Sequence, residues 1–166
     1  IIPVHLFGQA ANMEKIMLVA KKFNLQVIED TAQALGAIYR FSSGKKQKVG
    51  TIGTIGTTSF FPSKNLGAYG DGGAIFTNDD QLAKKIRGIV NHGMYERYHH
   101  EIVGVNSRLD SIQAAILNVK LKFLDQYNNS RKIAASKYSE LLCNNNKIKI
   151  PKVVGDNDSH VFHQYT

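Results

Sequence analysis

The chain has 166 residues, of which 43% are hydrophobic and 20% are charged. This composition is that of one ordinary globular domain, and it excludes low-complexity, collagen-like and disulfide-framework proteins. The 21 Lys and Arg residues against 13 Asp and Glu residues give a formal charge of +8. Such a charge suits an acidic partner, which can be nucleic acid, an anionic surface or a phosphorylated small molecule, and it also fits a soluble protein with a basic surface.

The single cysteine, Cys143, lies in a polar stretch, so there is no disulfide framework and a reducing compartment is expected. No apolar run approaches the roughly 20 residues that cross a bilayer, and the N-terminus lacks the order of a secretion signal. We therefore expect a cytoplasmic protein with no membrane partner. The chain opens at Ile1 and stops at Thr166 inside an apparent extended segment, so we also expect a fragment.

The first elements predict a βαβ unit. The apolar run 1–6 predicts a strand, and residues 13–23 have helical spacing with Asn12 as a possible N-cap and Asn24 as a stop. A second strand over 25–28 ends on Glu29 and Asp30, and such a unit closes onto a parallel sheet. The remaining predictions are an exposed hairpin around 44–48, strands over 57–61 and 73–77, a loop over 95–106, and helices from residue 79 to about 91, at 109–123 and at 133–142.

Two residues stand out for their chemistry. Asp30 follows a strand, and ligands of parallel α/β sheets bind outside the carboxyl ends of the strands; the alternative is an aspartate that caps a turn or helix. Lys64 lies in a turn just after an apolar strand, where desolvation can turn an amine into a nucleophile. The alternative is an ordinary solvated lysine.

Other patterns point away from several functions. The glycines at 50, 53 and 56 and at 67, 70, 72 and 73 do not have the spacing of a nucleotide-binding loop, and they favour tight turns or a close approach of backbone to a ligand. The six histidines form no zinc signature, so no metal is expected. The basic residues are scattered and match no nucleic-acid-binding module, so we expect no nucleic-acid partner.

Five segments stand out in order along the chain: PVHLFG at 3–8, EDTAQALGA at 29–37, SFFPSKNLG at 59–67 through GGA at 72–74, NHG at 91–93 and GVNSRLDSIQAA at 104–115. Together they closely resemble the DegT/DnrJ/EryC/StrS family of sugar aminotransferases, which are pyridoxal-phosphate enzymes with an aspartate-aminotransferase-like fold. The resemblance implies an α/β fold with three αβα layers and a mostly parallel central sheet, truncated at both ends. Residues 1–142 would be the central part of the cofactor-binding large domain, and 143–166 the start of the connection to a small C-terminal domain.

The resemblance also implies a role for five residues. Lys64 would bond covalently to pyridoxal 5'-phosphate and, once released, move a proton between substrate and cofactor. Asp30 would pair with the protonated ring nitrogen of the cofactor. Gln33 would lie near the phenolic oxygen of the ring, and Ser59 would bind the phosphate. Asn106 would reach the phosphate in the neighbouring subunit, which implies a homodimer.

The reaction implied by the resemblance moves an amino group from an amino acid, usually glutamate, to a keto sugar attached to a nucleotide diphosphate. The charge of +8 fits these phosphorylated compounds. Relatives that act as dehydratases have lost the lysine, so Lys64 favours transamination. A phosphate-binding loop and a ring-stacking aromatic residue of the family have no counterpart in residues 1–166, and Phe61 replaces a polar ring of some members. We therefore expect the 166 residues alone to be inactive, and the alternative function is a truncated, catalytically silent binding or dimerisation module.

Overall fold

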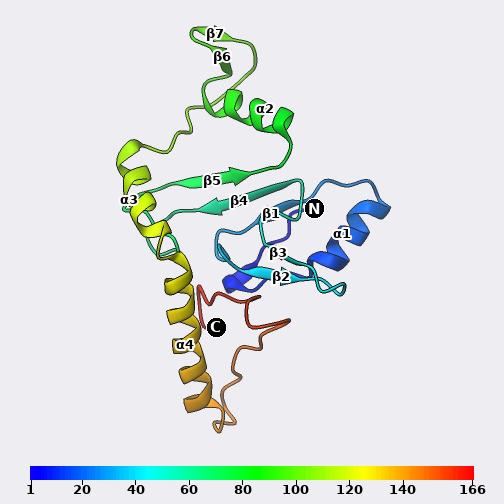
Figure 1. Ribbon diagram of the computed structural model, residues 1–166, viewed down its shortest axis with the longest axis vertical. Coiled ribbons are helices and arrows are strands. Elements are labelled where there is room, and N and C mark those ends of the chain that lie inside the picture. Colours follow the sequence, from blue (N-terminus) through cyan, green and yellow to red (C-terminus); the bar gives the residue numbers. More distant parts are fainter.

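The computed structural model describes all residues from 1 to 166, and its helices and strands pack around a partly parallel sheet, which confirms the predicted α/β class (Figure 1). A short 3-10 helix over Leu6–Gly8 precedes the first α-helix. The other elements are α1 (Met13–Lys22), β1 (Ile28–Asp30), β2 (Ile38–Arg40), β3 (Lys46–Lys48), β4 (Ile55–Ser59), β5 (Gly73–Phe76), α2 (Asp80–Val90), β6 (Met94–Glu96), β7 (His99–His100), α3 (Ser111–Leu121) and α4 (Leu124–Leu142).

The central sheet is partly parallel, with the strand order β1-β4-β5. Strands β1 and β4 run parallel, with Asp30 opposite Thr57, whereas β4 and β5 are antiparallel. The predicted first strand lies along the other edge of β1, where Val4 forms a single parallel bridge to Asp30. It is shorter than predicted because the chain turns into the 3-10 helix at Leu6, where the next residue, Phe7, has a φ of 58°.

The helix starts follow capping chemistry. Asn12 caps α1, as predicted, by accepting a hydrogen bond from the Lys15 amide (3.2 Å). Asp79 caps α2 by accepting from the amides of Gln81 (2.9 Å) and Leu82 (3.0 Å). Asp110 caps α3 in the same way, with the amide of Gln113 as donor (2.9 Å).

Two predictions for the second half of the chain were wrong. Helix α4 begins at Leu124, nine residues before the predicted start at 133. The apolar periodicity did not reveal the first half of α4, because the buried position one turn after Leu124 is the polar Asn128. The predicted loop over 95–106 contains the small hairpin of β6 and β7, which pairs Met94 with His100.

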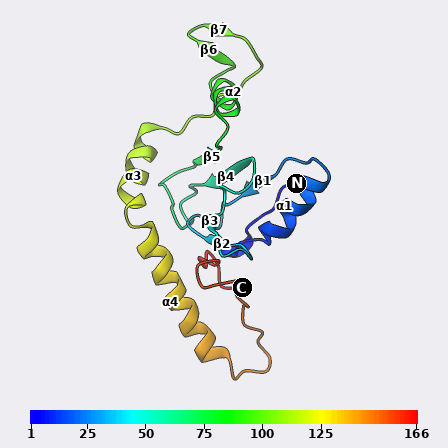
Figure 2. The same cartoon turned by 45° about the vertical axis from the view of Figure 1, so that its right-hand side comes forward.

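The helices flank the sheet on two sides (Figures 1 and 2). Helices α3 and α4 follow one another down one side of the molecule, and α1 lies on the opposite side of the sheet in both views. Helix α2 and the β6–β7 hairpin extend beyond β5. Residues 143–166 contain no helix or regular strand, but Val161 is buried with Ala10, Ala34 and Ala37 in one core cluster. No helix is both long and apolar enough to span a membrane.

Candidate functional site

Four of the predicted site residues lie at, or just after, the carboxyl ends of two neighbouring strands. Asp30 is the last residue of β1 and Ser59 is the last residue of β4, and these strands run parallel, so both residues lie at the same edge of the sheet. Gln33 is in the turn that follows β1. Lys64 is in the turn that follows β4, where its amide donates to the Phe61 carbonyl (2.9 Å). This edge is where ligands of parallel sheets bind.

The side chains of Asp30, Gln33 and Ser59 each use one bonding position locally and leave another for a ligand. The Asp30 carboxylate accepts the Ala32 amide at Oδ1 (2.9 Å), which leaves Oδ2 as an acceptor. Gln33 accepts the Phe7 amide at Oε1 (2.6 Å), which leaves its NH₂ group as a donor. The Ser59 hydroxyl oxygen accepts the Phe61 amide (3.2 Å), which leaves its O–H as a donor. The edge therefore offers a fixed negative charge and two neutral donors.

Lys64 is half-buried and forms no salt bridge. It lines a cavity of about 550 Å³ between its own turn and α4, together with Lys120 and Arg131. No carboxylate lines this cavity. Burial first, and then the positive charges of Lys64 and Arg131, lower the pKa of His163. Lys64 therefore shares its cavity with two other cationic residues and has no carboxylate partner.

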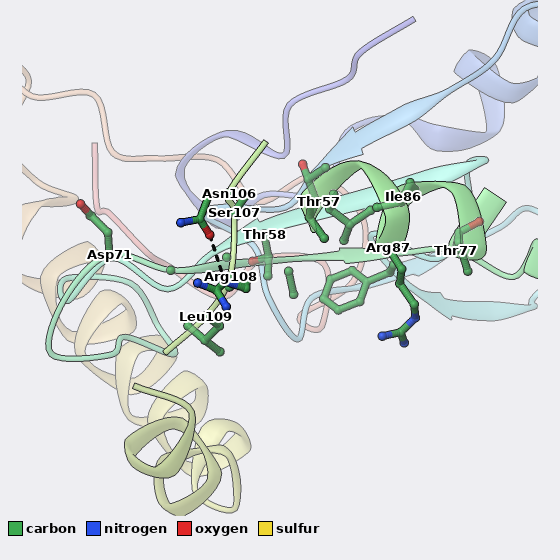
Figure 3. Close-up of a pocket in the computed structure, with 17 residues that line it drawn as sticks. Thr57, Thr58, Asp71, Thr77, Ile86, Arg87, Asn106, Ser107, Arg108 and Leu109 are labelled. Atoms are coloured by element: carbon green, nitrogen blue, oxygen red, sulfur yellow. Dashed lines mark hydrogen bonds between the residues drawn. The ribbon is translucent and has the colours of Figure 1, made fainter. Parts of the chain in front are cut away.

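Asn106 lies apart from the other four residues. It lines a cavity of about 920 Å³ between β4, β5, α2 and residues 106–109 (Figure 3). Its Oδ1 accepts a hydrogen bond from Nε of Arg108 (3.0 Å), which leaves its NH₂ group as a donor. Asp30, Ser59 and Lys64 are not part of this cavity. The structure therefore brings four predicted residues to one edge and places the fifth elsewhere.

Sequence reasoning missed the buried group that supports this edge. Glu29 is fully buried, and its carboxylate accepts hydrogen bonds from Nε2 of His5 (3.1 Å) and from the amides of Gly50 (2.8 Å), Ile52 (2.6 Å) and Gly53 (2.7 Å). Burial alone would raise the pKa of Glu29, but the bonds from His5 and the three amides hold it below its ordinary value. The first glycine cluster thus forms a tight turn around a carboxylate of the chain itself.

The signal for this network was present in the β1 sequence. Successive side chains of a strand point to opposite faces, so Glu29 points to the face opposite to that of Asp30. If that face is buried, the carboxylate of Glu29 needs hydrogen-bond partners. Nδ1 of His5 accepts the Ala11 amide (3.0 Å), so Nε2 carries the proton that is donated to Glu29. The network ties the first segment, β1 and the β3–β4 connection together directly behind Asp30.

Comparison with known proteins places this arrangement in a family. The chain is 54% identical over its whole length to the "Pleiotropic regulatory protein" of Geobacillus stearothermophilus, covering 44% of that protein. It is 49% identical, again over its whole length, to a UDP-N-acetyl-3-dehydro-alpha-D-glucosamine 3-aminotransferase of Acidithiobacillus ferrooxidans, covering 43% of it. The chain thus spans less than half the length of these relatives.

A solved structure and a family model agree with these relatives. The structure of NtdA from Bacillus subtilis with bound cofactor PMP superposes with a TM-score of 0.84 at 34% identity, and the match covers 99% of this chain and 36% of that one. The model of the DegT/DnrJ/EryC1/StrS aminotransferase family matches residues 1–166. The resemblance seen in the sequence motifs is therefore confirmed, and the chain belongs to the DegT/DnrJ/EryC1/StrS aminotransferase family.

Proposed function

We propose that the protein containing this chain is a pyridoxal-phosphate-dependent aminotransferase that moves an amino group from an amino acid, expected to be glutamate, to a nucleotide-linked keto sugar. One observation carries the proposal. At a single sheet edge, Asp30 has a free acceptor, Gln33 and Ser59 have free donors, and Lys64 has an amine without a counter-ion. This set fits a ring that carries a protonated nitrogen, a phenolic oxygen, a phosphate and an aldehyde. Family membership and the named activity of the Acidithiobacillus relative support the same assignment.

Each residue has a defined task in this proposal. Pyridoxal phosphate, when bound, supplies an electron sink for the charge that develops when substrate loses a proton. Oδ2 of Asp30 would accept the N–H of the ring and keep its positive charge in place. Gln33 and Ser59 would donate to the ring oxygen and the phosphate. Nζ of Lys64 would hold the cofactor in the resting protein by replacing its aldehyde oxygen, which leaves as water, and, once displaced by the substrate amine, would carry the proton between substrate and cofactor.

The charge of the chain supports the proposed substrates. Both a nucleotide diphosphate and the cofactor carry phosphate, and the +8 charge favours their approach.

The lone, exposed Cys143 fits a reducing compartment, so we place the reaction in the cytoplasm. Residues 1–142 are proposed as the central part of the cofactor-binding domain, with 143–166 leading toward a smaller domain.

We further propose that the active protein is a homodimer in which Asn106 serves the neighbouring subunit. Two observations support this: Asn106 is exposed with a free NH₂ group, and it lies outside the region of Asp30 and Lys64 in its own chain. Mixing inactive Lys64→Ala and Asn106→Ala proteins tests the proposal, because a mixed dimer has one site with both residues intact. Restored activity is expected, and two proteins that stay inactive when mixed would contradict it.

The function is tested by locating the cofactor bond. The full-length protein is incubated with pyridoxal phosphate, reduced with borohydride and digested, and the modified peptide is found by mass. We expect a pyridoxyl group on Lys64, its loss in Lys64→Arg, and its retention in Lys120→Arg, a matched change in the same cavity. Residues 1–166 alone are expected to form no adduct. An unmodified Lys64 in the full-length protein would overturn the proposal and leave a binding or dimerisation module as the alternative.

A further inference from the structure

A buried pair of asparagines joins the segment that carries Asp30 to the segment that carries Lys64. Asn65 and Asn128 are 6% and 5% exposed, and Nδ2 of Asn65 donates to Oδ1 of Asn128 (2.6 Å). Nδ2 of Asn128 in turn donates to the carbonyl of Leu35 (3.1 Å). Leu35 follows Asp30 in the β1 turn, and Asn65 directly follows Lys64. One side chain on α4 therefore bonds to both segments.

The residues around Asn128 and Asn65 fix this pair of asparagines, called here the bridge, in one orientation. Gly36 has a φ of +91°, and a Cβ atom at that position would lie 2.6 Å from Nδ2 of Asn128. The absence of a side chain at Gly36 thus lets α4 approach the β1 turn closely. Asn65 is held further by the Val161 carbonyl (3.2 Å) and by Nδ1 of His163 (3.2 Å). Both amides use donor and acceptor atoms, so neither can rotate without losing a buried bond.

We propose that Asn128 is a positioning residue that sets the spacing between Asp30 and Lys64 by bonding the segments that carry them. The inference rests on the proposed function, because the spacing matters only if both residues hold one cofactor. In the proposed function Lys64 and Asp30 hold two different atoms of one cofactor, so a change in the spacing of their segments would change the proton equilibrium of the lysine-bound cofactor. A displacement of about 1 Å is also enough to lower catalytic rates about 100-fold.

The test follows the visible absorption band of the lysine-bound cofactor as a function of pH, together with the thermal midpoint of unfolding, in the full-length protein. We expect Asn128→Leu, which has the same branching and no polar atoms, to shift the apparent pKa of this band by about half a unit or more, an approximately threefold change in the proton equilibrium. Asn128→Asp keeps the acceptor for Asn65 and loses the donor to Leu35. It provides the same readout if the leucine variant does not fold.

Two control variants separate positioning from stability. Asn129→Leu changes the neighbouring exposed asparagine and should leave both the band and the midpoint unchanged. Met13→Ala opens a cavity in the core around α1, away from the bridge, and should lower the midpoint without shifting the band. Asn128 variants that behave like Met13→Ala would overturn the positioning role alone. A wild-type protein with an unmodified Lys64 would instead overturn the proposed function, and the role of Asn128 with it.

Discussion

The buried carboxylate of Glu29 should be the most sensitive polar group in this fold. It accepts four hydrogen bonds, two at each oxygen: Oε1 binds the amides of Ile52 and Gly53, and Oε2 binds the Gly50 amide and Nε2 of His5. Glu29→Gln keeps the shape of the side chain but replaces one oxygen by an NH₂ group. In either orientation of the amide, that NH₂ group faces donors.

The loss of folding stability in Glu29→Gln follows from the hydrogen bonds that are lost. If the NH₂ group replaces Oε1, the amides of Ile52 and Gly53 lose their acceptor. If it replaces Oε2, the Gly50 amide loses its acceptor, and His5 cannot accept instead, because its Nδ1 already accepts the Ala11 amide. Loss of two buried bonds to a charged group, with the donors left unpaired, costs about 3–5 kcal/mol. This is a large part of the roughly 5–15 kcal/mol that stabilises a typical domain.

Urea denaturation of the full-length protein measures this loss. With an m-value of about 2 kcal/mol/M, the midpoint of Glu29→Gln should fall by about 1.5–2.5 M. Glu101→Gln is the matched control, because Glu101 is exposed and its side chain makes no hydrogen bond, and it should shift the midpoint by less than about 0.25 M. If both variants unfold at the wild-type midpoint, the reasoning that buried acceptors hold this edge together is refuted.

Two further predictions concern charge. Asp30→Asn keeps the acceptor for the Ala32 amide but removes the negative charge, so we expect a normal melting temperature and an amino-transfer rate at least about 100-fold lower; an unchanged rate would contradict the role of Asp30. Burial lowers the pKa of His160 to about 4 from its ordinary value of 6.5. The unfolded chain therefore binds more protons between these values, and this contribution to stability is full above about pH 6.5 and is lost toward pH 4. His160→Asn, whose Oδ1 can accept the Phe162 amide in place of Nδ1, should flatten the fall of the urea midpoint between pH 7 and pH 5; an unchanged slope would assign the pH dependence to other groups.

Much of the fold could be predicted because local chemistry and tertiary structure agree. The N-cap of α1, the βαβ order and the position of Asp30 at a strand end follow from short-range patterns, and the structure confirms them. The start of α4 was missed because its buried face includes Asn128, a residue that periodicity counts as exposed. The β6–β7 hairpin was missed because two adjacent histidines and the sequence around Met94 show no alternation of polar and apolar residues.

Local sequence patterns also miss buried polar residues around the candidate site. Lys64 and Asp30 could be named as candidates from their place after a strand, with their roles implied by the family resemblance, but the groups that connect their segments are polar, buried and distant in sequence. Asn128 meets Asn65 across 63 residues and Leu35 across 93, and Glu29 reaches Gly50 across 21. A buried asparagine or glutamate has no local signature, since what makes it tolerable is a partner supplied by the completed fold. The polar residues that break an apolar pattern in this chain are therefore the ones that connect the elements of the proposed site.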